Sequence, residues 1–276
     1  MNKEKQKLIK KIKEKKEYSS IPDSEVEKIL DLFDVEGKKY TDKEKFKLTR
    51  EMLMKLFSGT MSKKLLSPNI LNKKNVEEIL KKHLSTRERF EHYEELYSKI
   101  FKGINSGKDK KEKKEVFVID LGAGINGLSY NKFPEEFEVN YVGVEIVGRL
   151  VDLMNVYFRK NKVSRTPTGP AKAVQESLFN LKKVKNIVEE TNKPRIVFLF
   201  KILDSLETRE RDYSKKLLLE LKNMGIKRFV LSFSTESYIK KEKFKAKRKW
   251  IQNFIKENFR EIDNFELGGE RYIIFE

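Results

Sequence analysis

Three glycines follow a short apolar run in VIDLGAGINGL, residues 118 to 128. Gly122, Gly124 and Gly127 have the spacing GxGxxG, which lets a chain turn sharply off a strand and approach a ligand closely. In dinucleotide sites such a loop holds a pyrophosphate. Asp120 would repel a pyrophosphate, but its carboxylate can accept a hydrogen bond from the ammonium group of S-adenosylmethionine (SAM), directly or through water. The stretch therefore favours SAM.

Further polar residues stand where the next two predicted strands end. Glu145 lies at the tip of the second strand, and its carboxylate can accept hydrogen bonds from both ribose hydroxyls of an adenosine ligand. Gln175, Glu176 and Ser177 lie at the end of the third strand, where a polar side chain would meet the adenine amino group. A solvated turn is an equally simple interpretation of these three residues. Glu145 thus supports an adenosine cofactor, and the third strand adds little.

Strands and helices alternate from residue 116 onward, which is typical of parallel strands joined by crossover helices. The strands are expected at 116–120, 140–146, 171–175, 195–200 and 227–233, and the helices near 148–161, 179–191, 207–224 and 242–259. The end, REIDNFELGGERYIIFE, has two strands around a Gly-Gly turn and predicts an antiparallel hairpin. We therefore expect an α/β fold: the Rossmann-like sheet of class I SAM-dependent methyltransferases with a terminal antiparallel hairpin.

Helical periodicity dominates residues 1–102, and SEVEKILDLF places its apolar residues on one face. The Lys-rich segment GINSGKDKKEKKE, residues 103–115, marks a hinge or surface loop. We therefore expect an all-helical N-terminal domain over 1–107 and a SAM-binding methyltransferase domain over 108–276, and the family resemblance described below implies that the N-terminal domain docks the RNA.

Charge points to a polyanionic partner. The chain has 61 Lys and Arg against 43 Asp and Glu, a formal net charge of +18. A field of this sign attracts nucleic acid. A thermophile-type surface rich in Lys and Glu would explain the number of charges but not their imbalance. Nucleic acid is therefore the expected partner.

Other classes of protein are disfavoured by composition. The chain has no Cys and two His, which removes disulfides and thiolate nucleophiles and leaves little for a zinc site. No stretch approaches the roughly 20 apolar residues of a membrane span, and the charged N-terminus lacks the apolar segment of a signal peptide. We expect a cytoplasmic monomer with no metal and no membrane contact.

Five stretches, in matching order, resemble the 16S ribosomal RNA guanine-N7 methyltransferases of aminoglycoside-producing and aminoglycoside-resistant bacteria. The stretches are HLSTRERF (83–90), DLGAGINGL (120–128), FLFKILDSLE (198–207), VLSFSTESYIKKEKFKAKRKW (230–250) and ELGGERYIIF (266–275). They are similar to that family's S-T-[RK]-E-R and D-x-G-C-G-x-N-P-L motifs, its Lys after an apolar strand, its basic loop and its G-N-E-x-x-Y-I ending. The resemblance covers about residues 80–276, whereas residues 1–75 show none.

The resemblance implies a role for each matching residue in cofactor binding. Arg87 would bind the methionine carboxylate, a bidentate task suited to a guanidinium group, although an ion pair with Glu91 on the helix surface is an alternative. The other implied contacts are Asp120, Gly122 and Gly124 at the methionine end, Glu145 at the ribose, and Glu176 with Ser177 at the adenine edge. Lys201 would lie beside the methyl donor or the target base as a catalytic positioning residue, or would contact a phosphate.

The loop after the fifth strand is the expected RNA contact. Phe233, Ser234 and Tyr238 would receive the target base, although Phe233 also fits the core. The basic residues of this loop would hold phosphates, or would form a solvated Lys-rich helix face: Lys241, Lys243, Lys247 and Arg248.

The expected activity is SAM-dependent methylation of guanine N7 in ribosomal or transfer RNA. Guanine N7 is a lone-pair nucleophile that needs no deprotonation, so alignment with the sulfonium methyl suffices, which fits a chain poor in His and Cys. Two alternatives stay open. One is a SAM-dependent methyltransferase of protein or DNA, although the D/N-P-P-Y/F/W tetrad of amino-group methyltransferases is replaced here by KILD. The other is a noncatalytic RNA-binding or assembly factor on a methyltransferase scaffold.

Overall fold

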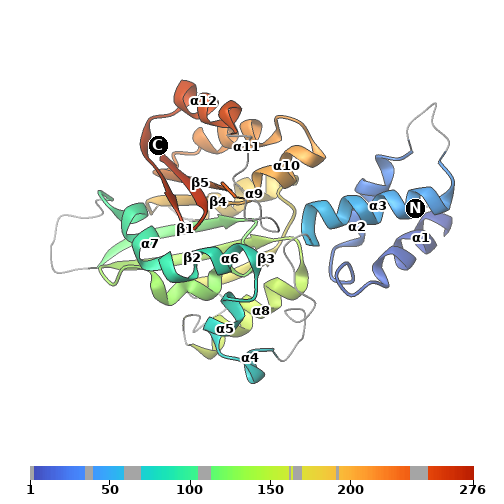
Figure 1. Cartoon of the computed structure of the whole chain (residues 1–276), viewed down its shortest axis with the longest axis horizontal. Coiled ribbons are helices and arrows are strands. Elements are labelled where there is room, and N and C mark those ends of the chain that lie inside the picture. Colours follow the sequence, from blue (N-terminus) through green and yellow to red (C-terminus); the bar gives the residue numbers. More distant parts are fainter. Residues whose placement is uncertain are drawn as a thin grey trace.

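A seven-stranded sheet forms the centre of the molecule in the computed structural model, with strand order β3-β2-β1-β4-β5-β7-β6 (Figure 1). The structure describes residues 3–34, 40–58, 70–104, 113–161, 163, 170–190, 193–236 and 248–276. The strands are Lys114–Leu121 (β1), Phe137–Glu145 (β2), Ala171–Gln175 (β3), Arg195–Phe200 (β4), Arg228–Ser234 (β5), Glu261–Leu267 (β6) and Glu270–Phe275 (β7). Strands β1 to β5 are parallel, and β7 runs antiparallel to both β5 and β6.

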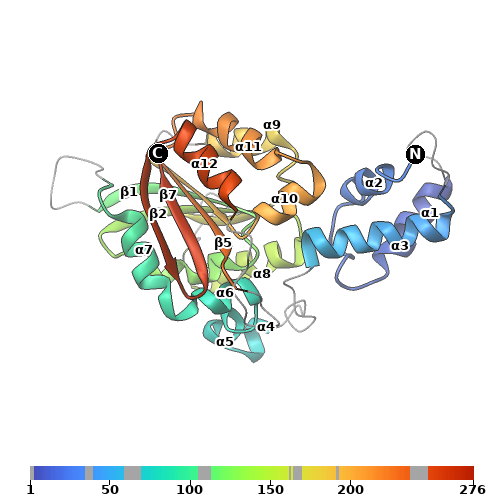
Figure 2. The same cartoon turned by 45° about the horizontal axis from the view of Figure 1, so that its top comes forward.

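Helices cover both faces of this sheet, which is why its central strands are apolar runs rather than alternating patterns. One face carries Leu181–Val188 (α9), Leu203–Arg209 (α10), Tyr213–Lys222 (α11) and Lys249–Asn258 (α12). The other face carries Leu84–Arg89 (α6), Tyr93–Phe101 (α7) and Gly148–Lys160 (α8). Figure 2 shows the two helical layers on either side of the strands. All residues of β1 from Val116 onward are buried between them.

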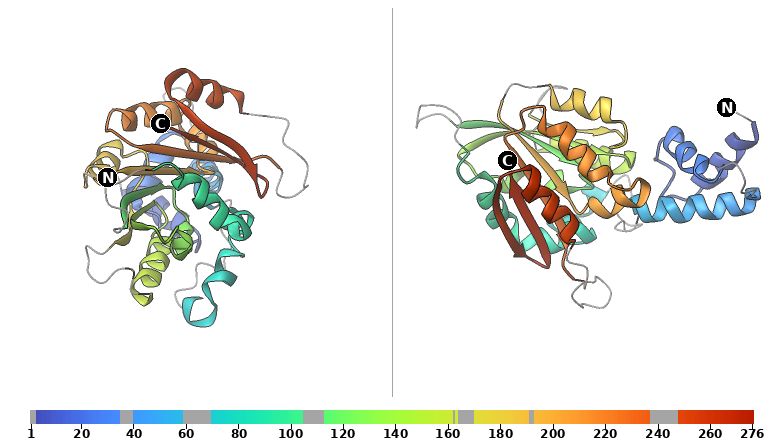
Figure 3. Two further views of the ribbon diagram at one scale, coloured as in Figure 1. Left: turned by 90° about the vertical axis from the view of Figure 1, so that its left-hand side faces the viewer. Right: turned by 90° about the horizontal axis from the view of Figure 1, so that it is seen from above.

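The helical N-terminal region has two parts. The first is a small bundle of Lys3–Lys13 (α1), Asp23–Asp31 (α2) and Asp42–Leu53 (α3), which continues into a π-helical turn, Met54–Ser58 (η1). This bundle stands at one end of the molecule, and the C-terminal end of α3 meets the sheet domain beside α10 (Figure 3). The second part is Ile70–Lys73 (α4), Val76–Leu80 (α5), α6 and α7. It lies with the sheet: Tyr97 of α7 stacks on Phe198 of β4 with ring centroids 6.1 Å apart.

The predicted fold class is confirmed, and the bounds of β3 and β4 are those expected from the sequence. The helix predicted over 207–224 was wrong in its limits, because it begins at Leu203 and is divided into α10 and α11. The division is stabilised by Glu207, whose carboxylate accepts hydrogen bonds from the backbone N–H groups of Asp212 and Ser214. The helix predicted over 242–259 is described only from Lys249, and the expected domain boundary at 107/108 lies outside the described residues.

No helix among the described residues is long and apolar enough to span a bilayer.

Candidate cofactor-binding site

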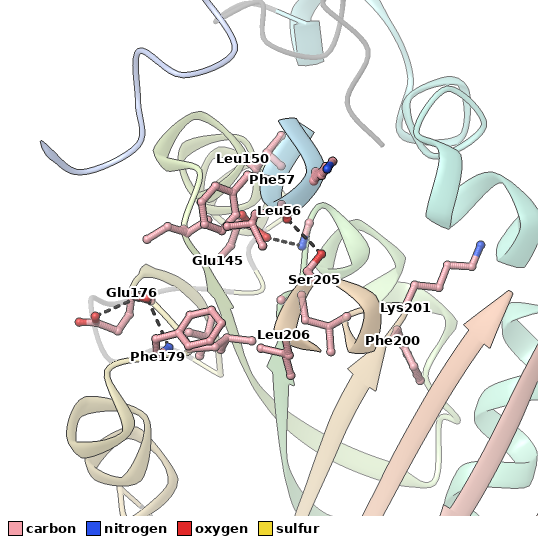
Figure 4. A pocket seen from close by; sticks show the side chains of 18 of the residues that line it. Leu56, Phe57, Glu145, Leu150, Glu176, Phe179, Phe200, Lys201, Ser205 and Leu206 are labelled. Carbon is pink, nitrogen blue, oxygen red and sulfur yellow. Dashed lines mark hydrogen bonds between the residues drawn. The ribbon is translucent and has the colours of Figure 1, made fainter. Parts of the chain in front are cut away.

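A pocket opens at the carboxyl ends of β1, β2, β3 and β4, where the strand order reverses and α/β proteins bind their ligands. The pocket and the solvent at its open mouth together occupy about 910 Å³. Figure 4 shows Glu176 and Phe179 at one end of the pocket and Lys201 at the other, with Glu145 between them.

The glycine loop after β1 forms part of the pocket wall. Gly122 and Gly124 both line the pocket, and both have left-handed backbone angles, with φ of +75° and +56°. A Cβ on Gly122 would come within 2.7 Å of Ile202 Cδ1. Gly127 has a different role, because a Cβ there would press to 2.8 Å on the ring of Phe158. The first two glycines therefore shape the pocket, and the third permits close packing.

Glu145 presents a buried carboxylate to the pocket from the end of β2. Its Oε2 accepts a hydrogen bond of 2.9 Å from the backbone N–H of Gly124, and its Oε1 accepts one of 2.9 Å from Val147. Burial raises the pKa of Glu145. A carboxylate has about four lone-pair positions, so acceptor capacity is left for a diol. Glu145 thus ties the glycine loop to β2 and keeps a ribose-binding function open.

Asp120 lies behind the glycine loop rather than on the pocket wall. It is 1% exposed, and its Oδ2 accepts hydrogen bonds of 2.8 Å from Asn126 Nδ2 and from the Tyr141 hydroxyl. Burial raises the pKa of Asp120. Its Oδ1 has no hydrogen-bond partner among the described residues. Asp120 therefore orders the loop, and a contact between its carboxylate and a cofactor ammonium remains a proposal.

The segment after β3 lines the adenine end of the expected site. Glu176 Oε1 accepts a hydrogen bond from the backbone N–H of Ser177, and Glu176 Oε2 lies 3.1 Å from Lys183 Nζ. The Ser177 hydroxyl donates to Glu25 Oε2 of α2 over 3.0 Å. Both predicted residues are on the pocket wall, but the hydroxyl of Ser177 already has a partner from the N-terminal bundle.

Lys201 follows β4 on the pocket wall with a left-handed φ of +55°, an uncommon conformation for a residue with a Cβ. Its ammonium group is ion-paired with Glu88 of α6 and lies 3.6 Å from Glu270 Oε2 of β7. Glu270 is fully buried and also accepts a hydrogen bond from the Ser232 hydroxyl. Lys201 is thus neutralised by carboxylates within the protein, and its part in positioning substrate stays a proposal.

Arg87 is exposed and is not among the residues that line the pocket. Arg89, from the same STRER stretch, is the arginine that points inward. Its Nη1 donates to Asn126 Oδ1 over 3.0 Å, and its Nε lies 3.5 Å from Glu270 Oε2. The structure does not bring Arg87 to the site, and it places Arg89 between the glycine loop and β7.

Of the residues predicted to contact RNA, Phe233 and Arg248 make contacts inside the protein instead. Phe233 is buried in the core, so it does not face a target base. Arg248 donates to Asp204 through Nε and Nη2, at 3.2 and 2.7 Å, and to the carbonyl of Ser234 through Nη1 at 3.0 Å. These contacts replace the expected phosphate contact of Arg248 in this structure. Tyr238, Lys241, Lys243 and Lys247 lie outside the described residues.

Several wall residues were not predicted. His83 lies against Gly124, and burial together with the nearby charges of Arg89 and Lys201 lowers its pKa to about 3. Leu56 and Phe57 reach the pocket from η1. His83 stands two residues before Ser85, the first residue of the STRER stretch, so its place beside that motif was a signal in the sequence. No sequence motif at residues 54–58 indicates a binding site, because only the tertiary fold brings these residues to the pocket.

The residues present fit SAM. The pocket supplies a glycine cradle that a Cβ would fill, a buried carboxylate with spare acceptor capacity, and apolar walls that include Leu150, Phe179 and Leu206. Sites for small ligands are commonly apolar concavities with a few placed polar groups.

Solved structures of RNA methylases match the chain over its whole length. The 16S rRNA methylase RmtB aligns with a TM-score of 0.71 and 18% identity, covering 99% of this chain and 98% of RmtB. RmtF, solved in complex with S-adenosyl-L-homocysteine, aligns with a TM-score of 0.73 and 17% identity, covering 100% and 99%. An rRNA methylase from Escherichia coli gives 0.70 and 18%, covering 99% of each chain.

These matches establish that the chain has the fold of those methylases, including the helical N-terminal region. The resemblance inferred from five short motifs is therefore confirmed at the level of the fold. No protein-family model and no curated protein matches the sequence.

Proposed function

We propose that this protein is a SAM-dependent methyltransferase that acts on guanine N7 in structured RNA. The proposal rests on the whole-length structural match to 16S rRNA methylases. It is supported by the pocket at the carboxyl ends of the parallel strands, where the strand order reverses. The small ribosomal subunit is the leading substrate, and transfer RNA is the second.

Binding of SAM would use the chain's own groups in order along the pocket. Glu145 would accept the ribose hydroxyls, and Glu176 with Phe179 would border the adenine. The backbone of Gly122 and Gly124 would lie along the methionine end, and Phe200 and Lys201 would flank the reacting end. When bound, SAM supplies an electrophilic methyl group, and the protein's task is to align an acceptor with it and exclude water.

The groups on the pocket wall favour an acceptor that needs no base. His83 is the imidazole on this wall, and with a pKa of about 3 it is a poor proton acceptor at neutral pH. The Lys201 side chain is paired with the carboxylates of Glu88 and Glu270. Guanine N7 attacks through a lone pair and loses no proton, so it suits this environment better than an amino group or a hydroxyl does.

The charge of the chain supports RNA as the acceptor rather than a protein. A net charge of +18 favours a phosphate backbone, and such binding is expected to weaken steeply with salt. A noncatalytic RNA-binding role is the second candidate. It would be favoured if the wild-type chain bound RNA but not SAM.

The test is methyl transfer from SAM labelled on its methyl group. Separate reactions contain intact small ribosomal subunits, deproteinised 16S rRNA, transfer RNA, duplex DNA and a mixture of ribosomal proteins. Wild-type protein is compared with Glu145→Gln. Label in an RNA fraction that depends on Glu145 supports the proposal, and label confined to protein or DNA would overturn it.

A further inference from the structure

Part of the cofactor pocket is built by the N-terminal bundle. Among the described lining residues, Lys55, Leu56 and Phe57 belong to η1, His83 is the N-cap of α6, and the others belong to the sheet domain. In Figure 4 the side chains of Leu56 and Phe57 lie beside Glu145 and Leu150. This is the place where the proposed function puts the ribose and the adjoining part of the adenine.

We propose that Leu56 and Phe57 are cofactor-binding residues that close the pocket over the adenosine. The proposal rests on SAM being the ligand of this pocket. Leu56 is 5% exposed although it belongs to a short turn at the end of a helix, so its side chain is held against the pocket and not in solvent. An adenosine between this turn and the sheet would bury apolar surface on both sides, which is a favourable term in binding.

Polar contacts to three groups of the N-terminal bundle hold it to the pocket rim: the carbonyls of Leu56 and Ser20 and the carboxylate of Glu25. The Ser205 hydroxyl donates to the carbonyl of Leu56 over 3.1 Å, so this contact involves one of the two residues proposed to cover the adenosine. The backbone N–H of Gly148 donates to the carbonyl of Ser20 over 3.2 Å, and Gln175 Nε2 donates to the same carbonyl. Each contact therefore joins the bundle to a segment that follows a pocket strand or lines the pocket.

The third of these groups is the carboxylate of Glu25, which forms an ion pair and a hydrogen bond. Glu25 of α2 is 3% exposed and accepts a hydrogen bond of 2.6 Å from Arg209 Nη1 and one of 3.0 Å from the Ser177 hydroxyl. Ser177 lies on the pocket wall and Arg209 ends α10. The position of the bundle and the shape of the adenosine end of the pocket are thus fixed by the same contacts.

It follows that cofactor affinity depends on the bundle, and that cofactor binding in turn stabilises the docked position of the bundle. The two effects are reciprocal, because any ligand that binds the docked arrangement better must favour it.

The experiment measures binding of S-adenosyl-L-homocysteine to the full chain by calorimetry. The variants are Phe57→Ala and Leu56→Ala, and the control is Met54→Ala, which lies in the same turn but is exposed and not on the pocket wall. We expect about tenfold weaker binding for each pocket variant, which corresponds to the loss of one large apolar contact. Met54→Ala should bind within about twofold of the wild type. Thermal unfolding identifies any variant that fails to fold.

A second measurement needs no variant. Hydrogen exchange of the wild-type chain is followed with and without S-adenosyl-L-homocysteine, and backbone amides of α3 and η1 should become more protected on binding. Unchanged or tighter binding by Phe57→Ala, together with unchanged exchange in α3, would overturn the inference. Failure of the wild type to bind would overturn the proposed function instead.

Discussion

The ammonium group of Lys201, after β4, is ion-paired with the carboxylate of Glu88 on α6. Lys201 also lies 3.6 Å from Glu270 Oε2, so one cation joins α6, β4 and β7 next to the pocket. The side chains of Lys201 and Glu88 are 12% and 20% exposed. The left-handed backbone of Lys201 is held by hydrogen bonds from its N–H to the carbonyl and hydroxyl of Ser232.

We predict that Lys201→Met lowers the free energy of unfolding by about 2 to 4 kcal/mol, because it leaves Glu88 without its cation in a largely buried site and Glu270 with Arg89 alone. The double variant with Glu88→Gln should show a coupling energy of about 1 to 2 kcal/mol in a double-mutant cycle measured by urea unfolding. Lys47→Met, on an exposed helix face, is the control and should cost less than about 0.5 kcal/mol. Additive effects of the Lys201 and Glu88 variants would contradict the ion pair.

We predict that Glu145→Gln weakens binding of S-adenosyl-L-homocysteine by about 10- to 100-fold. The carboxylate would lose charge-assisted hydrogen bonds to the ribose, and it would hold the N–H of Gly124 less firmly. Glu138→Gln is a matched control on the same strand, because Glu138 is exposed and distant in register from the strand end. Equal affinity of the Glu145 variant and the wild type would remove Glu145 from the site.

Acid should destabilise the protein through His83. Its pKa in the folded chain is about 3 against an ordinary 6.5, so the folded state disfavours the imidazolium form. The stability that depends on neutral His83 is fully present above pH 6.5 and is lost as the pH falls toward 3. At pH 5 the free energy of unfolding should have fallen by roughly 2 kcal/mol for this reason. In His83→Gln the fall in unfolding free energy between pH 7 and pH 5 should be smaller by that amount. An NMR titration that places the His83 ring near 6 would contradict this prediction.

Glu25 contributes stability with a different pH range. Burial raises its pKa, but hydrogen bonds from Lys28 and Arg209 outweigh burial and leave the pKa below 4.5. Its contribution is therefore present above pH 4.5 and is lost as the pH falls through the lowered value. Glu25→Gln should cost about 2 to 4 kcal/mol at pH 7. The control is Glu27→Gln, because the ion pair of Glu27 with Lys5 is more exposed; this variant should lower the free energy of unfolding by less than about 1 kcal/mol. Equal losses in the two variants would show that the Glu25 ion pair stabilises the fold no more than an exposed one does.

The positions of the strands along the chain could be predicted because the central strands are short apolar runs that end in polar residues. The central strand β4 has the predicted bounds for this reason, β3 at the edge of the sheet also has them, and the Gly-Gly turn before Glu270 marked the final hairpin. Glu145 and the first two glycines could be placed at the pocket because the ends of parallel strands meet at one edge of a sheet.

Side-chain directions could not be predicted. The STRER stretch contains two arginines, and the packing of α6 decides that Arg89 is buried and Arg87 is exposed. Thr86 fixes that orientation by donating to the carbonyl of Leu80. Arg248 was expected to contact phosphate, but Asp204, which is distant in sequence, binds it. Leu56 and Phe57 reach the pocket through the docking of a separate bundle, for which a local pattern gives no signal.

The most direct test of the account is the identity of the methylated nucleoside. Intact small ribosomal subunits, deproteinised 16S rRNA and transfer RNA are incubated with the protein and methyl-labelled SAM, and each RNA is digested to nucleosides for mass spectrometry. We expect label in 7-methylguanosine, with small subunits as the best substrate. Label in a base-methylated adenosine or a ribose-methylated nucleoside, or no label despite measurable SAM binding, would contradict it.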